Sequence, residues 1–109
     1  MNINEWVETV HNNAKDKGFW DTFKGTNDER LSKHMLMVSE LAEATESVRK
    51  GEESTYWDGP KPEGEAVELA DCAIRIMDYF GQMKWDLEAV IVSKHNYNVT
   101  RERLHGKKL

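Results

Sequence analysis

Two pairs of carboxylates stand at the same spacing in similar stretches of sequence. Glu40 and Glu43 belong to Ser-Glu-Leu-Ala-Glu, and Glu68 and Asp71 belong to Glu-Leu-Ala-Asp. On a helix, residues three apart share one face, with Cβ atoms about 5–6 Å apart, so each pair can close on one cation. Two such pairs on facing helices would form a cage of carboxylate oxygens.

The types of these ligands indicate which ion the cage would take. Carboxylate oxygens suit hard cations, and neither Cys nor His stands at ligand spacing beside the four acids. Mg²⁺ is therefore favoured, with Mn²⁺ as the alternative, and Zn²⁺ is disfavoured. Mg²⁺ held by a few carboxylates completes its shell with water and substrate phosphate, which indicates phosphate chemistry. A di-iron site is disfavoured because the Glu-x-x-His pattern that it needs on two helices is lacking.

The acidic pairs also have a plainer explanation, as solvated helix surface. At about 100° per residue, both pairs fall at the edge or back of the main apolar stripe of their helices. Two observations weigh against this explanation. Like charges at this spacing destabilise a helix, and apolar residues border the pairs, with Leu36 beside Glu40 and both Val67 and Ile74 beside Asp71. Neighbouring like charges also shift each other's protonation strongly, so four such acids brought together favour a bound cation.

Four helices are expected to position these residues. Caps, breakers and apolar periodicity predict helices over about 2–18, 26–51 and 63–79, the third of them stopping at Gly81, and a fourth from about 86 to beyond 101. Residues 52–62 are expected to form a loop, and no segment alternates convincingly as a strand does. The chain of 109 residues is therefore predicted to be one all-α domain over residues 1–109, a subunit of the four-helix-bundle type.

The second of these helices is expected to be the longest and to carry a broad apolar stripe. Its members are Leu31, Met35, Val38, Leu41, Ala42, Thr45 and Val48.

Polar residues continue the apolar face of the fourth helix. Leu87, Val90 and Ile91 define an inward face, and helical spacing carries that face onto Lys94, Asn98 and Arg101. Lys and Arg suit phosphate oxygens, and the amide of Asn98 suits a sugar hydroxyl or a base edge. The alternative is that the helix leaves the core at this point and that the three residues face solvent.

Aromatic residues gather in the two longer connections. Trp20 follows the first helix, and Tyr56 and Trp57 lie in the loop over 52–62. Aromatic residues in such places more often plug a core than hold a ligand, although a nucleobase could stack on Trp20. Tyr56 and Trp57 could close over a ligand or pack against a neighbouring subunit.

Composition narrows the class of partner and the compartment. The net charge is −5, and residues 94–109 hold five cationic residues against the single anion Glu102. This acidic body with a basic tail argues against nonspecific nucleic-acid binding. The single cysteine, Cys72, excludes an intrachain disulfide, and the lack of a leader or long apolar run predicts a cytoplasmic protein without a membrane partner. So short a chain buries a modest core, so we expect it to form a homo-oligomer.

The ordered acidic and basic motifs resemble one protein family. Glu40-x-x-Glu43, a 24-residue spacer, Glu68-x-x-Asp71 and then Lys94, Asn98 and Arg101 are similar to the MazG-like branch of the all-α nucleoside triphosphate pyrophosphohydrolases. The likeness covers roughly residues 18–108. The resemblance implies a helical bundle assembled as a homodimer or homotetramer. It also implies Mg²⁺-dependent cleavage of a nucleoside triphosphate between the α and β phosphates, giving a monophosphate and pyrophosphate.

The resemblance also implies roles for individual residues. Glu40, Glu43, Glu68 and Asp71 correspond to the metal ligands, and Lys94, Asn98 and Arg101 to substrate contacts. Some relatives place an aromatic residue near the end of the second helix to stack on the base, where this chain has Arg49 and Lys50. In this chain, Trp20, Tyr56 or Trp57 would have to stack on the base instead.

The mechanism expected from this resemblance is hydrolysis by a metal-activated water. One glutamate, here Glu43, would accept the proton of that water. Lys94 and Arg101 would stabilise charge on the phosphate oxygens. Two alternatives from other classes stay open, a non-catalytic helical oligomerisation module and a nucleotide-sensing subunit that binds without turnover.

Overall fold

The computed structural model describes residues 1–108, without the side chains of residues 105 and 106. The elements are α1 (Ile3–Asp16), α2 (Asn27–Arg49), β1 (Tyr56–Asp58), β2 (Lys61–Glu63), α3 (Glu65–Met83), α4 (Leu87–Val99) and a short 3-10 helix (Arg103–Gly106). The prediction of a mainly helical chain is confirmed. Over the described residues, no helix has both the length and the apolar character needed to span a membrane.

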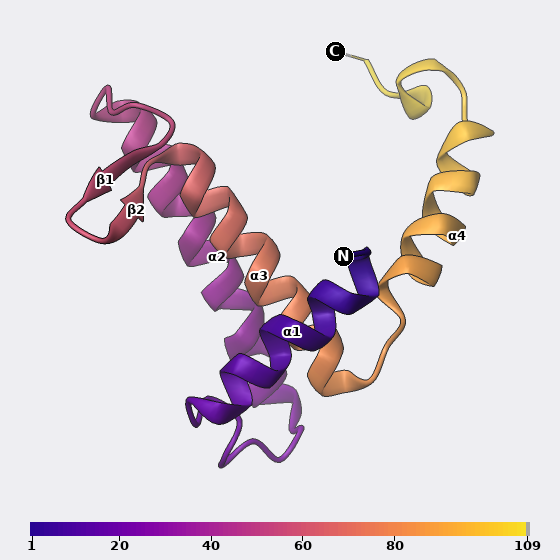
Figure 1. The fold of residues 1–109 in the computed structure, drawn as a ribbon. Coiled ribbons are helices and arrows are strands. Elements are labelled where there is room, and N and C mark those ends of the chain that lie inside the picture. The colour runs from indigo at the N-terminus through magenta and orange to yellow at the C-terminus, as the bar shows by residue number, and fades with distance from the viewer. Residues whose placement is uncertain (109) are drawn as a thin grey trace.

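The helices are arranged around one antiparallel pair. α2 and α3 run side by side in opposite directions, joined at one end by the β1–β2 hairpin, and α1 crosses the pair near its other end (Figure 1). α4 projects away from α2 and α3 (Figure 1). Its start is tied to α1, since the Asn4 amide donates to Asp86 Oδ1 at 3.0 Å and the backbone N–H of Glu88 donates to Asn4 Oδ1 at 3.2 Å.

Local sequence explains where the helices begin. Thr26 and Glu29 form the predicted capping box of α2, each side chain bonding the backbone of the other residue. Asn2 caps α1 by accepting from the N–H of Glu5, and Asp86 caps α4 by accepting from the N–H of Ala89.

Two predicted helix ends are wrong. The third helix was expected to stop at Gly81, but α3 continues through it to Met83 and ends at Lys84, which has the left-handed φ of 59°. Gly81 instead permits a close approach of α1, because a Cβ there would lie 2.6 Å from His11 Cβ. The fourth helix was expected to run past Arg101, but α4 ends at Val99 with Thr100 as its C-cap.

The absence of strands was also predicted wrongly. Inside the expected loop, Tyr56 pairs with Glu63 and Asp58 pairs with Lys61 in an antiparallel hairpin. Each strand has three residues, which is too short for alternation of polar and apolar residues to be recognised.

A small aromatic core lies where α1 crosses α2 and α3. Ala14, Trp20 and Tyr79 are buried there, with Phe23 packed against them. The rings of Trp20 and Phe23 meet edge to face with centroids 4.8 Å apart. No large side chain in the described part of the chain is fully buried, so the core of this chain is small.

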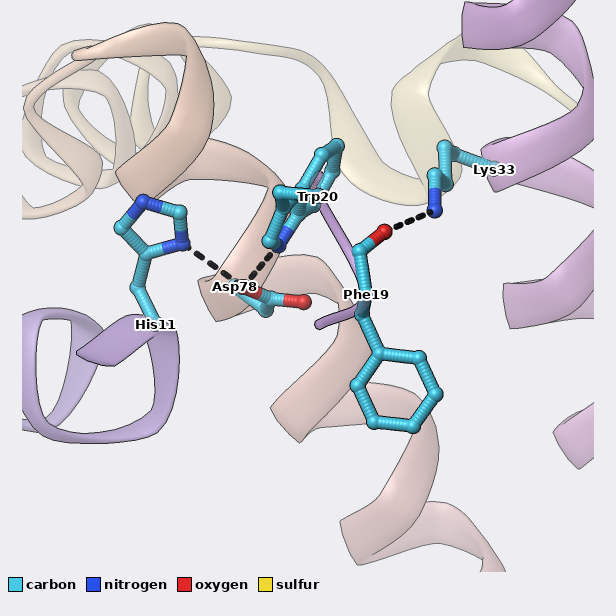
Figure 2. A network of polar contacts seen from close by, with 5 residues as sticks. All are labelled: His11, Phe19, Trp20, Lys33 and Asp78. Carbon is cyan, nitrogen blue, oxygen red and sulfur yellow. Dashed lines mark hydrogen bonds and ion pairs between the residues drawn. The ribbon is translucent and has the colours of Figure 1, made fainter. Parts of the chain in front are cut away.

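One carboxylate fastens α1 and the segment after it to α3. Asp78 Oδ1 lies 2.8 Å from His11 Nδ1 and accepts a hydrogen bond from Trp20 Nε1 at 2.9 Å (Figure 2). Lys33 Nζ donates to the carbonyl oxygen of Phe19 at 3.4 Å (Figure 2) and lies 4.4 Å from the centre of the Trp20 ring. We refer to His11, Trp20 and Asp78 as the Asp78 clamp.

α2 presents its polar face to α3 and its apolar stripe to solvent. Glu40, Ala44 and Ser47 are buried, and the small side chains of the latter two permit close approach of α3. Five residues of the apolar stripe are 46–59% exposed, namely Leu31, Met35, Val38, Leu41 and Val48. The usual place of such a stripe is against a core, so the protomer leaves uncovered the surface that would ordinarily be buried.

Candidate metal centre

α2 and α3 bring three of the four predicted metal ligands together. Glu40, Glu68 and Asp71 each offer a carboxylate oxygen, and these oxygens all lie within 4.8 Å of one another. Glu40 and Glu68 are buried, each 9% exposed, despite their charge. We call Glu40, Glu43, Glu68 and Asp71 the acid cluster.

Glu43, the fourth acid, lies at the outer edge of this group. Its side chain is exposed, yet its carboxylate is a hydrogen-bond partner of Glu68. The plainer explanation of the acids as scattered, solvated surface therefore does not describe Glu40 and Glu68, which face the α2–α3 interface.

The proximity of these acids changes their protonation. Burial is the largest cause that raises the pKa of Glu68 to about 7, followed by hydrogen bonds to Glu40 and Glu43 and by repulsion from Glu43 and Asp71. Burial and the charge of Glu40 also raise the pKa of Asp71, and the nearby guanidinium of Arg75 lowers it in part. A cation bound among these carboxylates would offset the same repulsion.

Two cations beside the acid cluster were not singled out from the sequence. Arg75 Nε donates to Glu40 Oε1 at 2.8 Å. Its position four residues after Asp71 was the available signal, because residues at that spacing share a helix face. Lys61 Nζ lies 2.8 Å from Glu63 Oε1 in the hairpin. That hydrogen bond is the first cause that raises the pKa of Lys61, and charges of the acid cluster add to it. No pattern in the sequence indicated Lys61.

Cavities open on two sides of the acid cluster. The larger, of about 750 Å³, lies between α1, α2 and α3 and has Glu40, Asp71, Arg75, Trp20 and Tyr79 in its walls. The smaller, of about 300 Å³, is lined by Glu43, Ser47, Glu63 and Glu68 among others. The larger has the size of a small-molecule site.

The predicted substrate contacts of the fourth helix lie away from the acid cluster. Lys94 and Asn98 belong to α4, which projects from α2 and α3 (Figure 1), and Arg101 comes just after it. The charged groups of Lys94 and Arg101 lie 4.9 and 5.6 Å from the centre of the Tyr97 ring. Val90 and Ile91 are exposed rather than inward. Within one protomer, this matches the alternative in which the fourth helix leaves the core.

The aromatic candidates occupy different environments. Trp20 is 8% exposed and belongs to the core, with the Lys33 ammonium over its ring, although it also lines the larger cavity. Tyr56 donates to Glu52 Oε2 at 2.7 Å. That bond is the main cause that raises the pKa of Tyr56 to about 12. Trp57 is exposed.

Comparisons with known proteins return no match to this chain, whether against protein-family models, curated proteins or solved structures. Its function has to be inferred from the residues and their geometry.

Proposed function

We propose that this protein is a Mg²⁺-dependent nucleoside triphosphate pyrophosphohydrolase that releases a nucleoside monophosphate and pyrophosphate. The observation that carries the proposal is the convergence of Glu40, Glu68 and Asp71 oxygens within 4.8 Å. These are positions at which the resemblance to MazG-like enzymes places metal ligands. Glu43 beside them completes the ligand set. All four offer oxygen, which fits Mg²⁺ and also Mn²⁺.

The residues of the acid cluster divide the chemistry between them. A bound divalent ion supplies charge neutralisation at the phosphates and a water of lowered pKa. Glu40, Glu68 and Asp71 would hold that ion together with Glu43. Glu43, the exposed member, would also accept the proton of the attacking water as general base.

We also propose that the working form is a homodimer or homotetramer. Two observations support this. The apolar stripe of α2 is exposed, and so are Val90 and Ile91 of α4. A second copy that covers these surfaces would complete the predicted helical bundle. Lys94, Asn98 and Arg101 would then meet the acid cluster of a partner rather than that of their own chain.

The test of activity is pyrophosphate release from a panel of canonical and modified nucleoside triphosphates with Mg²⁺. We expect turnover of at least one nucleotide and its loss with EDTA. Glu43→Gln should lower kcat by about 100-fold or more, the range typical of a lost general base, and Asp71→Asn should lower turnover by weakening metal binding. Glu8→Gln, which removes an exposed carboxylate of α1, is the matched control and should leave kcat unchanged.

Two outcomes would overturn the assignment. One is a kcat that is unchanged in both Glu43→Gln and Asp71→Asn, and the other is no turnover of any nucleotide. Nucleotide binding without pyrophosphate release would favour the sensing subunit, and neither binding nor release would favour an oligomerisation module, which the exposed stripe of α2 also suits.

A further inference from the structure

Arg75 is the cation that the described structure holds closest to the acid cluster. Its Nε donates to Glu40 Oε1 at 2.8 Å, and its side chain is 42% exposed while that of Glu40 is 11% exposed. Arg75 therefore stands between a buried carboxylate and an open space, which is the cavity of about 750 Å³ that it lines together with Glu40 and Asp71.

The guanidinium has donors left for a ligand. An arginine carries five N–H groups in a rigid plane, and the Nε–H is the one bonded to Glu40. Among the described residues, no acceptor is hydrogen-bonded to the two Nη groups. Such a fork matches the oxygens of a phosphate, and the partial exposure of Arg75 leaves it accessible from the cavity.

Other cations are less well placed to meet a phosphate at these acids. Lys33 also lines the cavity, but its ammonium bonds the Phe19 carbonyl and lies over Trp20. Lys61 is paired with Glu63. Lys94 and Arg101 belong to the segment that projects away from α2 and α3 (Figure 1).

We propose that Arg75 is a phosphate-contacting residue supplied by the same protomer as the acid cluster. Through Nε it holds Glu40 in position, and through Nη it binds a phosphate oxygen of the nucleotide in the cavity between α1, α2 and α3. This inference rests on the proposed function. It adds a substrate contact on α3 that is independent of α4 and of the oligomer.

The test measures metal and nucleotide binding separately in the full chain. Mn²⁺ binding is followed by electron paramagnetic resonance. Binding of a nucleoside triphosphate with a non-hydrolysable α–β methylene bridge is followed by calorimetry in Mg²⁺, on the nucleotide that the wild type turns over. We expect Arg75→Ala to bind Mn²⁺ and to weaken analogue binding about 10- to 100-fold, as for a lost charge-assisted hydrogen bond.

Two further variants separate charge from packing. Arg75→Gln can still donate to Glu40 but is neutral, so its analogue binding should be as weak as that of Arg75→Ala, which also covers the case in which Arg75→Ala does not fold. Arg75→Lys should recover part of the affinity. Lys17→Ala is the control of equal charge change, since Lys17 is exposed at the end of α1, and it should bind the analogue as the wild type does.

The results distinguish this inference from the proposed function. Wild-type analogue affinity in Arg75→Gln, with Mn²⁺ bound, would overturn the role of Arg75 alone. Loss of Mn²⁺ and analogue binding together in every Arg75 variant would assign Arg75 to the integrity of the acid cluster and would also overturn the contact. A wild type that binds no Mn²⁺ would overturn the proposed function itself.

Discussion

Glu68 interacts with all three other members of the acid cluster. It is buried between α2 and α3, hydrogen-bonded to Glu40 and Glu43 and repelled by Asp71. Each of these influences favours the neutral carboxyl, which raises its pKa from the ordinary 4.5 to about 7. Near neutral pH the Glu68 carboxyl is therefore only partly ionised without metal, and a bound cation would compete with its proton.

This gives stability a specific dependence on pH. A carboxyl whose pKa is raised by folding stabilises the folded state fully below its unfolded pKa, and that contribution is lost as pH rises through about 7. In EDTA, we expect the melting temperature to fall by a few degrees between pH 5 and pH 8. Glu29 and Asp86, whose pKa values are lowered by hydrogen bonds from the backbone N–H groups of Thr26 and Ala89 respectively, titrate below this window.

Glu68→Gln is the control for this prediction, because the amide cannot ionise. Its melting temperature, measured by circular dichroism, should fall less than that of the wild type over the same interval. Mg²⁺ should stabilise the wild type more at pH 8 than at pH 5, since metal and proton compete for the same oxygens. If the melting temperatures of the wild type and Glu68→Gln fell equally between pH 5 and pH 8, Glu68 would not be the source of the pH dependence.

At the scale of elements, the β1–β2 hairpin is held to the start of α3 by Gly64. This residue has a φ of +115°, and a Cβ there would lie 2.5 Å from the carbonyl oxygens of both Glu53 and Ser54. The same segment is bonded to α3, since the N–H of Ala66 donates to the carbonyl of Ser54 at 2.9 Å. The first turn of α3, which ends at Glu68, is thus fixed by the loop before the hairpin.

Gly64→Ala should therefore disturb both stability and the acid cluster. We expect the free energy of unfolding, measured by chemical denaturation, to fall by about 1–3 kcal/mol, as for other strained backbone positions. Mn²⁺ binding, measured by electron paramagnetic resonance, should also be weaker. Gly59→Ala is the matched control. Gly59 also has a positive φ, of +60°, but a Cβ there meets nothing within 4 Å, so Mn²⁺ binding should be retained. Equal Mn²⁺ binding in the two variants would contradict this role of Gly64.

Local sequence predicted the helices better than it predicted their ends. The capping box at Thr26 and the cap at Asp86 depend on neighbouring residues, so they can be recognised in sequence. Gly81 was mistaken for a helix end because its role depends on His11, which is distant in sequence but close in the fold. The hairpin was missed because its short strands are fixed by pairing with each other rather than by propensity.

At the scale of the whole molecule, the apolar stripe of α2 is left uncovered. It lies on the side of the helix opposite to Glu40 and Ala44, and it includes Leu31, Met35 and Val38, each about half exposed. Helical residues at this spacing commonly pack against another helix.

Val38→Glu should weaken self-association if this stripe is the interface between copies. We expect sedimentation velocity to show a smaller species than the wild type, because a carboxylate would have to be desolvated in the contact. Ser32→Glu adds the same charge at an exposed position of α2 outside the stripe and should leave the wild-type size. An unchanged size for Val38→Glu would place the interface elsewhere.

The candidate site shows the same division between what is local and what is not. The proximity of the acids could be predicted because the same motif occurs on two antiparallel helices. The two copies therefore lie at the same height along the helix pair. Their facing direction could not be predicted, because α2 has an apolar and a polar face and only packing decides which meets α3. The place of Lys94 and Asn98 depends on how α4 docks, which spacing within α4 does not encode.

The hairpin tip at Gly59 divides the chain into two parts of nearly equal length. α1 and α2 come before it, α3 and α4 after it, and the tip is exposed. Exposed tips of this kind are the usual sites of chain cleavage. Glu40 and Glu43 would then belong to one fragment and Glu68 and Asp71 to the other, with the Asp78 clamp also spanning the cut. A divalent ion in the acid cluster would then take ligands from both fragments. We therefore expect the two halves to reassemble on addition of metal.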